Sequence, residues 1–204
     1  MRLHSSGDRR SPTTTTAVVT AVLAAVLVAG LAGCGGQSPP GPATPATTVV
    51  DAALRPGQAV PAPASVTATV LTLTGLVGAT NTGPALAFDR VTLDQLGLAK
   101  VSLFEPWTKK TMQFQGVWLA DLLKVAQIDA SARTLQLSAL DDYQVELTMA
   151  EVNAGGILLA TGTGDGSPIP VEDGGPTRIV FVDGTASGKS ADQWIWSLKA
   201  IDVR

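Results

Sequence analysis

Few side chains in this 204-residue chain are suited to nucleophilic or metal chemistry. The chain has one histidine, His4, and one cysteine, Cys34, and both lie near its start. Zinc, copper and haem sites are built largely on histidine and cysteine ligands, and Ser-His-Asp or Cys-His catalysis needs an imidazole. Residues 35–204 contain neither histidine nor cysteine, so sites and mechanisms of these kinds are excluded there.

The position of Cys34 indicates export. A basic segment precedes an apolar run at residues 17–32, which is shorter than the ~20 residues that a membrane-spanning helix needs. The run ends in Leu31-Ala32-Gly33-Cys34, which resembles the lipobox of bacterial lipoproteins. The resemblance implies a signal peptide at residues 1–33 and acylation of Cys34, for example with palmitate. The alternative is an ordinary secretory signal with a chance cysteine.

Two acyl chains would anchor the protein stably on a membrane, and we expect it on the extracytoplasmic side of the cell membrane. Residues 34–64 are rich in Pro, Ala and Thr and contain no aromatic residue, which predicts a disordered tether. Residues 65–204 are then one domain, long enough for a single core.

The charge of the mature chain argues against nucleic acid as a partner. Without Asp8 and the arginines of residues 1–33, the 14 basic and 17 acidic residues fall to 11 and 16, a net charge near −5. The only adjacent basic pair is Lys109-Lys110, so no basic patch is predicted. A small ligand or an envelope protein is the partner left to consider.

The domain pattern predicts an α+β, mostly β fold with a mixed sheet and few short helices. Alternating or continuous apolar runs predict strands at residues 66–73, 86–92, 101–104, 111–114, 134–140, 143–147, 157–160, 178–182 and 193–203. The one clear helical spacing is at residues 118–126. Thr148 and Glu151 form a Thr-x-x-Glu capping box, which predicts a helical turn after residue 148.

Several of these segments together resemble a known family. They are the G-V-W-L-A-D-L-L run from Gly116, the pair Asp142-Tyr143, and G-G-P-T-R from Gly174 leading into a valine-rich strand. This order is similar to the molybdopterin-binding oxidoreductase domain of the sulfite oxidase family, over roughly residues 68–203. The resemblance implies that family's fold.

The resemblance also implies a molybdopterin site, which this sequence matches only in part. In the family the metal is held by the pterin dithiolene and by one cysteine thiolate, expected between residues 101 and 116, where no cysteine occurs. The resemblance places Arg178, Lys189 and Tyr143 at cofactor-binding positions. The favoured alternative for Arg178 is an edge-strand residue paired with Asp173 or Glu172.

Other motifs have simpler explanations. The run Gly184 to Ser190 ends like a phosphate-binding loop but has three residues between its glycines where that loop has four. The aspartates fall in turn segments, where they bond their own backbone. Trp194 and Trp196 are expected to share a face of the last strand, in the core or against a ligand.

The hypothesis is therefore a lipid-anchored binding or scaffolding module that keeps the fold, lacks the metal-ligand cysteine and binds no cofactor. The alternative is a molybdopterin-dependent oxidoreductase with an atypical cofactor site.

Overall fold

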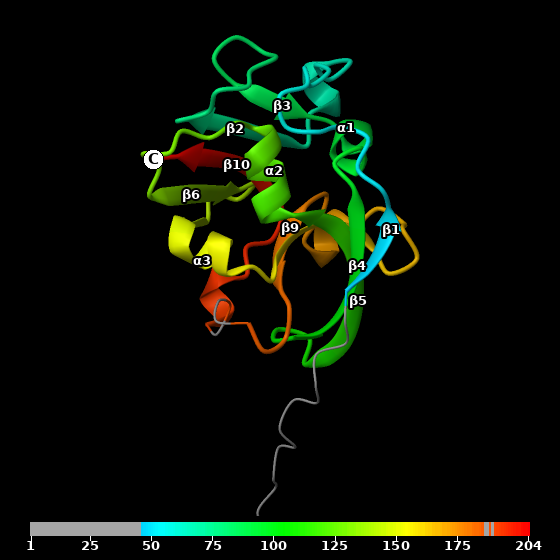
Figure 1. The fold of residues 1–204 in the computed structure, drawn as a ribbon. Coiled ribbons are helices and arrows are strands. Elements are labelled where there is room, and N and C mark those ends of the chain that lie inside the picture. The colour runs from blue at the N-terminus through cyan, green and yellow to red at the C-terminus, as the bar shows by residue number, and fades with distance from the viewer. Residues whose placement is uncertain (1–45, 186–187, 189) are drawn as a thin grey trace, which may run out of the picture. The chain divides into compact units, whose positions relative to one another are not determined.

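Alternating apolar strands build two five-stranded sheets in the computed structural model, which describes residues 46–185, 188 and 190–204 (Figure 1). The first sheet is antiparallel throughout, in the order β1 (Thr47–Val50), β4 (Leu98–Glu105), β5 (Lys110–Trp118), β8 (Ile157–Thr163) and β9 (Arg178–Phe181). The second has the order β3 (Leu86–Phe88), β2 (Leu71–Gly75), β10 (Leu198–Val203), β6 (Thr134–Ala139) and β7 (Gln144–Thr148). It is mixed, because β10 pairs parallel with β2 and antiparallel with β6.

The helices are short, as the sequence predicts. The α-helices are α1 (Arg90–Asp94), α2 (Leu119–Val125) and α3 (Met149–Ala154). The 3-10 turns are η1 (Val66–Ala68), η2 (Val171–Asp173) and η3 (Ala191–Gln193). The mostly β prediction with a mixed sheet is confirmed.

One apolar core joins both sheets to α2. On α2 the buried side chains are Leu119, Leu122, Leu123 and Val125, which match the spacing that predicted this helix. They belong to the same buried cluster as residues of β2, β5, β8 and β10. Gly116 on β5 has no room for a side chain, since a Cβ there would collide with the backbone of Leu159 on β8.

The start of α3 is closed by the predicted capping box. Thr148 Oγ1 accepts a hydrogen bond from the backbone N–H of Glu151 at 3.2 Å, and Glu151 Oε2 accepts one from the N–H of Thr148 at 2.7 Å. Two N–H groups that the helix itself leaves without a partner are thereby satisfied.

The predicted tether is wrong in its second half. β1 pairs with β4, the N–H groups of Ala53 and Leu54 donate to the carbonyl of Gln95, and Val60 is buried. All four side chains of β1 are exposed, so its pairing rests on backbone hydrogen bonds and gives no apolar pattern in the sequence. Residues 34–45 and the signal-peptide segment lie outside the described residues.

The last strand is shorter than predicted. Residues 191–193 form η3, and β10 begins only at Leu198. The stretch between them runs along the outer edge of β9, where the N–H of Ile179 donates to the carbonyl of Ile195 and the N–H of Leu198 to that of Thr177. Trp194 and Trp196 therefore lie on an irregular segment and not on a strand face.

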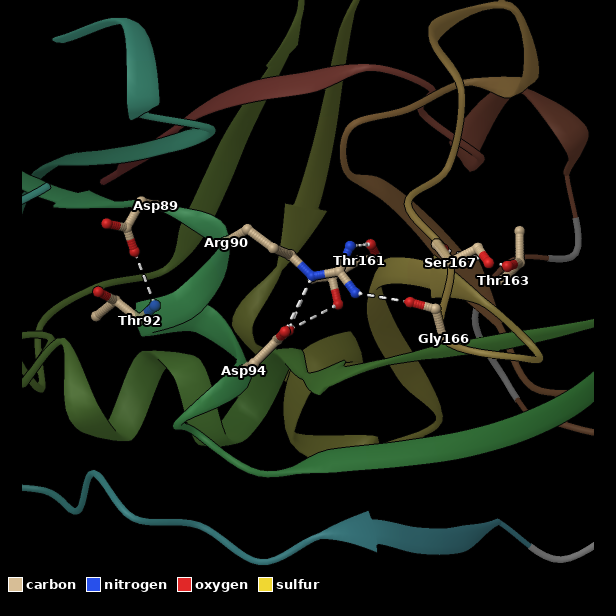
Figure 2. A network of polar contacts seen from close by, with 8 residues as sticks. All are labelled: Asp89, Arg90, Thr92, Asp94, Thr161, Thr163, Gly166 and Ser167. Carbon is tan, nitrogen blue, oxygen red and sulfur yellow. Dashed lines mark hydrogen bonds and ion pairs between the residues drawn. The ribbon is translucent and has the colours of Figure 1, made fainter. Parts of the chain in front are cut away.

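A polar network centred on Arg90 fastens α1 to β8 and the loop after it (Figure 2). The Arg90 Nε donates to both carboxylate oxygens of Asp94, at 3.0 and 3.1 Å, and its Nη atoms donate to the carbonyls of Thr161 and Gly166. Thr161 Oγ1 donates to Asp94 at 3.4 Å. This network holds the start of the Gly/Pro loop that leads to β9.

Within the part of the chain that the structure describes, no helix is both long and apolar enough to cross a bilayer.

Candidate functional site

Arg178, the first residue of β9, points into the protein and is 2% exposed. Its Nη2 donates to Glu105 Oε1 at 2.9 Å, and its Nη1 donates to the backbone carbonyl of Asp173 at 3.0 Å. Glu105, the last residue of β4, is completely buried. The predicted pairing of Arg178 with Asp173 or Glu172 needs correction, because its ion pair is with Glu105 and Asp173 contacts it through the backbone carbonyl.

The guanidinium of Arg178 is also stacked between two aromatic rings. Its Cζ lies 4.4 Å from the ring centroid of Trp196 and 5.2 Å from that of Phe114. Burial lowers the pKa of the Arg178 guanidinium, whereas the hydrogen bond and charge of Glu105 raise it. A carboxylate, a carbonyl and two rings therefore occupy most of the surface of this group.

Beside this pair lies an aromatic groove with a volume of about 470 Å³. Its walls are Trp107, Tyr143, Trp194 and Trp196, with two carboxylates, Asp141 and Asp192, and two alanines. Trp107 comes from the β4–β5 turn of the first sheet, and Tyr143 precedes β7 in the second. The two tryptophans after η3 complete the groove, which we call the aromatic groove below.

Tyr143 lies in this groove and not against Arg178 in the interactions described. It is 46% exposed, and its hydroxyl donates to the backbone carbonyl of Asp192 at 2.9 Å. Its own N–H donates to Asp141 Oδ1 at 3.1 Å, in the β6–β7 turn. The hydroxyl therefore ties the β6–β7 turn to η3 across the groove.

Two other predicted site residues, Lys189 and Cys34, lie outside the described residues, as does part of the loop from Gly184 to Ser190. Of the predicted site residues, Arg178 contacts Trp196, and Tyr143 lines the aromatic groove together with Trp196.

Asp141 and Asp165 have the turn roles that the sequence predicts, whereas Asp142 pairs with Lys199 and Asp183 bonds a distant strand. Asp165 accepts hydrogen bonds from the hydroxyl of Thr163 and the N–H of Ser167, and the pKa of its carboxyl is lowered mainly by the first of these. Asp183 accepts from the N–H of Phe104. No group of three or more His, Cys, Asp or Glu side chains among the described residues could hold a metal ion.

Two residues of the site, Glu105 and Trp107, were not predicted from the sequence. Glu105 continues the inward-facing alternation of Val101 and Leu103 on β4, so its burial was readable from the period-2 pattern. A buried carboxylate requires a partner, but nothing in the sequence identified Arg178 as that partner. Trp107, 55% exposed at the β4–β5 turn, gave no periodic signal at all.

The fold and the site together define a class, the molybdopterin-type oxidoreductase domain. The family model of the oxidoreductase molybdopterin binding domain matches residues 94–204, more than half of the chain, and the chain belongs to that family. A comparison with curated proteins found no match.

Among solved structures, the chain is similar to the sulfane dehydrogenase SoxCD from Paracoccus pantotrophus, with 17% sequence identity and a TM-score of 0.52. The similarity covers 65% of this chain and 37% of that one, so the chain spans little more than a third of that protein. At this identity the likeness establishes the fold. The predicted resemblance to a molybdopterin-binding oxidoreductase domain is confirmed.

Proposed function

We propose that this chain is a cell-envelope lipoprotein whose molybdopterin-type domain is a non-catalytic binding module without a molybdenum cofactor. The observation that carries the proposal is that the guanidinium of Arg178 is buried and already in contact with other groups of the protein. The resemblance assigns this residue to the cofactor phosphate, but its guanidinium is buried against Glu105, Asp173, Phe114 and Trp196. A phosphate that took the place of Glu105 on the Nη2 of Arg178 would leave a buried carboxylate without its charge partner.

The available donor set points the same way. A molybdenum dithiolene in this family takes a cysteine thiolate, and the only cysteine of the chain, Cys34, precedes the family match at residues 94–204. Hydroxyl and carboxylate oxygens are a poor substitute for this soft ligand. The residues present therefore do not fit the cofactor.

One observation favours the alternative of an oxidoreductase with an atypical cofactor site. Two buried N–H groups, Arg178 Nε and Trp196 Nε1, have no hydrogen-bond acceptor among the described residues. An unpaired buried donor costs free energy, so an acceptor from water or a ligand would stabilise them. Two single donors do not replace the several cations that usually meet a phosphate, which leaves this alternative second.

The binding role is supported by the aromatic groove. It is lined by large apolar surfaces with a few polar groups, the usual composition of a small-ligand site, and its volume lies in the usual range. The groove adjoins Trp196, whose ring covers Arg178. The domain would thus bind its ligand in the aromatic groove, beside Arg178, the residue that the resemblance assigns to the cofactor phosphate.

Pterin content tests the proposal. The full-length protein would be purified from a host that makes molybdopterin, denatured in acidic iodine, and assayed for fluorescent pterin. We expect less than about a tenth of an equivalent, because each charge-assisted hydrogen bond missing from the phosphate site removes ~1.5–3 kcal/mol of interaction. A pterin content near one per chain would overturn the proposal and favour the oxidoreductase.

A further inference from the structure

We propose that the aromatic groove binds an organic ammonium cation, of the quaternary or methylated amine class. This inference rests on the proposed function, because it requires that no cofactor fills the groove. Aromatic rings attract such cations through the negative potential of their faces, at distances up to about 6 Å. Four aromatic side chains line this one groove, and two of them are only half-buried, Trp107 and Tyr143.

Three of the four rings, those of Tyr143, Trp194 and Trp196, are held in place by contacts within the protein. Trp194 Nε1 donates to the carbonyl of Gly188 at 3.1 Å, and its ring packs against Phe181 with 5.6 Å between centroids. The Tyr143 hydroxyl is held by the carbonyl of Asp192, and Trp196 is stacked on Arg178. A site that is already ordered loses little entropy on binding. Trp107 is the exposed wall that can adjust.

The charges in the groove select a cation. Its only charged lining residues are Asp141 and Asp192, so its potential is negative. Two cations near the groove are paired, Arg178 with Glu105 behind Trp196 and Lys199 with Asp142 at 2.7 Å. The hydrogen bond from Lys199 lowers the pKa of Asp142, so this neighbouring carboxylate stays ionised.

The same lining argues against a carbohydrate or an anion. A sugar that stacks on tryptophan can donate its hydroxyls to the carboxylates of Asp141 and Asp192, but its hydroxyl oxygens also accept hydrogen bonds and need donors. Among the residues that the structure describes, the lining includes no Asn, Gln, Lys, Arg or His. An anion would meet two carboxylates, and the described lining residues include no cation to offset them. A neutral apolar ligand would leave the two negative charges of the lining without a counter-charge.

The decisive experiment compares choline with 3,3-dimethylbutan-1-ol, which has the same shape without the charge. Three of the four tryptophans of the chain, Trp107, Trp194 and Trp196, line the groove, so tryptophan fluorescence reports on its occupancy. We expect saturable binding of choline and at least about tenfold weaker binding of the neutral compound, the ratio that 1.4 kcal/mol of cation–π and carboxylate attraction gives.

Variants locate the site. Trp107→Ala removes the exposed wall and is expected to weaken choline binding about fivefold or more. The double change Asp141→Asn with Asp192→Asn keeps the shape, removes both charges, and is expected to reduce the preference for choline over the neutral compound. Phe104→Ala and Glu146→Gln are the matched controls, an exposed aromatic and an exposed carboxylate outside the groove, and should change binding less than twofold.

The outcomes separate this inference from the proposed function. No choline binding, equal binding of both compounds, or no effect of Trp107→Ala would overturn the ammonium assignment. In a sample free of pterin, those results would leave the binding-module proposal standing. A sample with stoichiometric pterin would instead overturn the proposed function, whatever the choline result.

Discussion

The guanidinium of Arg178 and the carboxylate of Glu105 form a buried pair 73 residues apart in the sequence. Glu105 has a second task, because its Oε2 accepts a hydrogen bond of 2.6 Å from the N–H of Thr108 and so orders the β4–β5 turn. That turn carries Trp107. The pair therefore connects the buried side of Trp196 with the exposed wall of the aromatic groove.

Glu105→Gln tests this pair at the residue scale. The substitution keeps the size of the side chain but leaves the charge of Arg178 without its partner in a buried place. Removing one partner of a buried pair costs roughly 3–5 kcal/mol, so we expect the free energy of unfolding in urea to fall by about 3 kcal/mol. Asp121→Asn, in the exposed pair with Lys124, is the control and should cost no more than about 0.5 kcal/mol. Equal effects of the two substitutions would show that the Arg178 pair is not an important internal contact.

At the scale of elements, local patterns were sufficient where the interactions are local. The spacing of Leu119, Leu122 and Leu123 predicted α2, and Thr148 with Glu151 predicted the start of α3. The hairpin of β6 and β7 followed from alternation around a turn of two aspartates.

The other features of the fold and of the groove depend on long-range interactions, which leave no pattern in the sequence. β1 has no buried side chain, so its pairing with β4 left no pattern. Trp194 and Trp196 alternate like strand residues, yet backbone bonds between this segment and the edge of β9 hold it outside regular structure. The groove consequently could not be predicted, because it forms where turns from both sheets meet that segment.

The capping box of α3 also makes a prediction about pH. The N–H of Thr148, followed by its hydroxyl, lowers the pKa of Glu151 from its ordinary value of 4.5, and hydrogen bonds likewise lower the pKa of Asp165 from 3.8. A carboxylate whose pKa is lower in the folded state stabilises the fold above its ordinary pKa, and this contribution is lost as pH falls through the folded value.

We therefore expect the urea midpoint to decrease as pH falls below about 4.5. Glu151→Gln should lower stability at pH 7 and flatten part of this dependence, because the amide cannot titrate. The check is a series of urea titrations from pH 7 to pH 3 on both proteins. A midpoint that rises on acidification would contradict the assignment.

At the scale of the whole molecule, the proposed location on the membrane depends on Cys34. Two acyl chains would supply nearly all of the membrane affinity, at about 0.8 kcal/mol for each buried methylene group. We expect Cys34→Ser to block lipidation and to leave the protein uncleaved or released from the membrane fraction. Ser38→Ala, four residues on, is the control and should behave as the unaltered protein. Unchanged processing and membrane retention of Cys34→Ser would refute the lipoprotein proposal.

The central claim is that the chain keeps the fold of its family without the molybdenum cofactor. Elemental analysis of the full-length protein, purified from a host that makes molybdopterin, tests it most directly. The absence of cysteine from residues 35–204 and the engagement of Arg178 by Glu105 predict a folded protein with no stoichiometric molybdenum. About one molybdenum per chain would contradict the claim and make this protein an oxidoreductase with an unusual metal site.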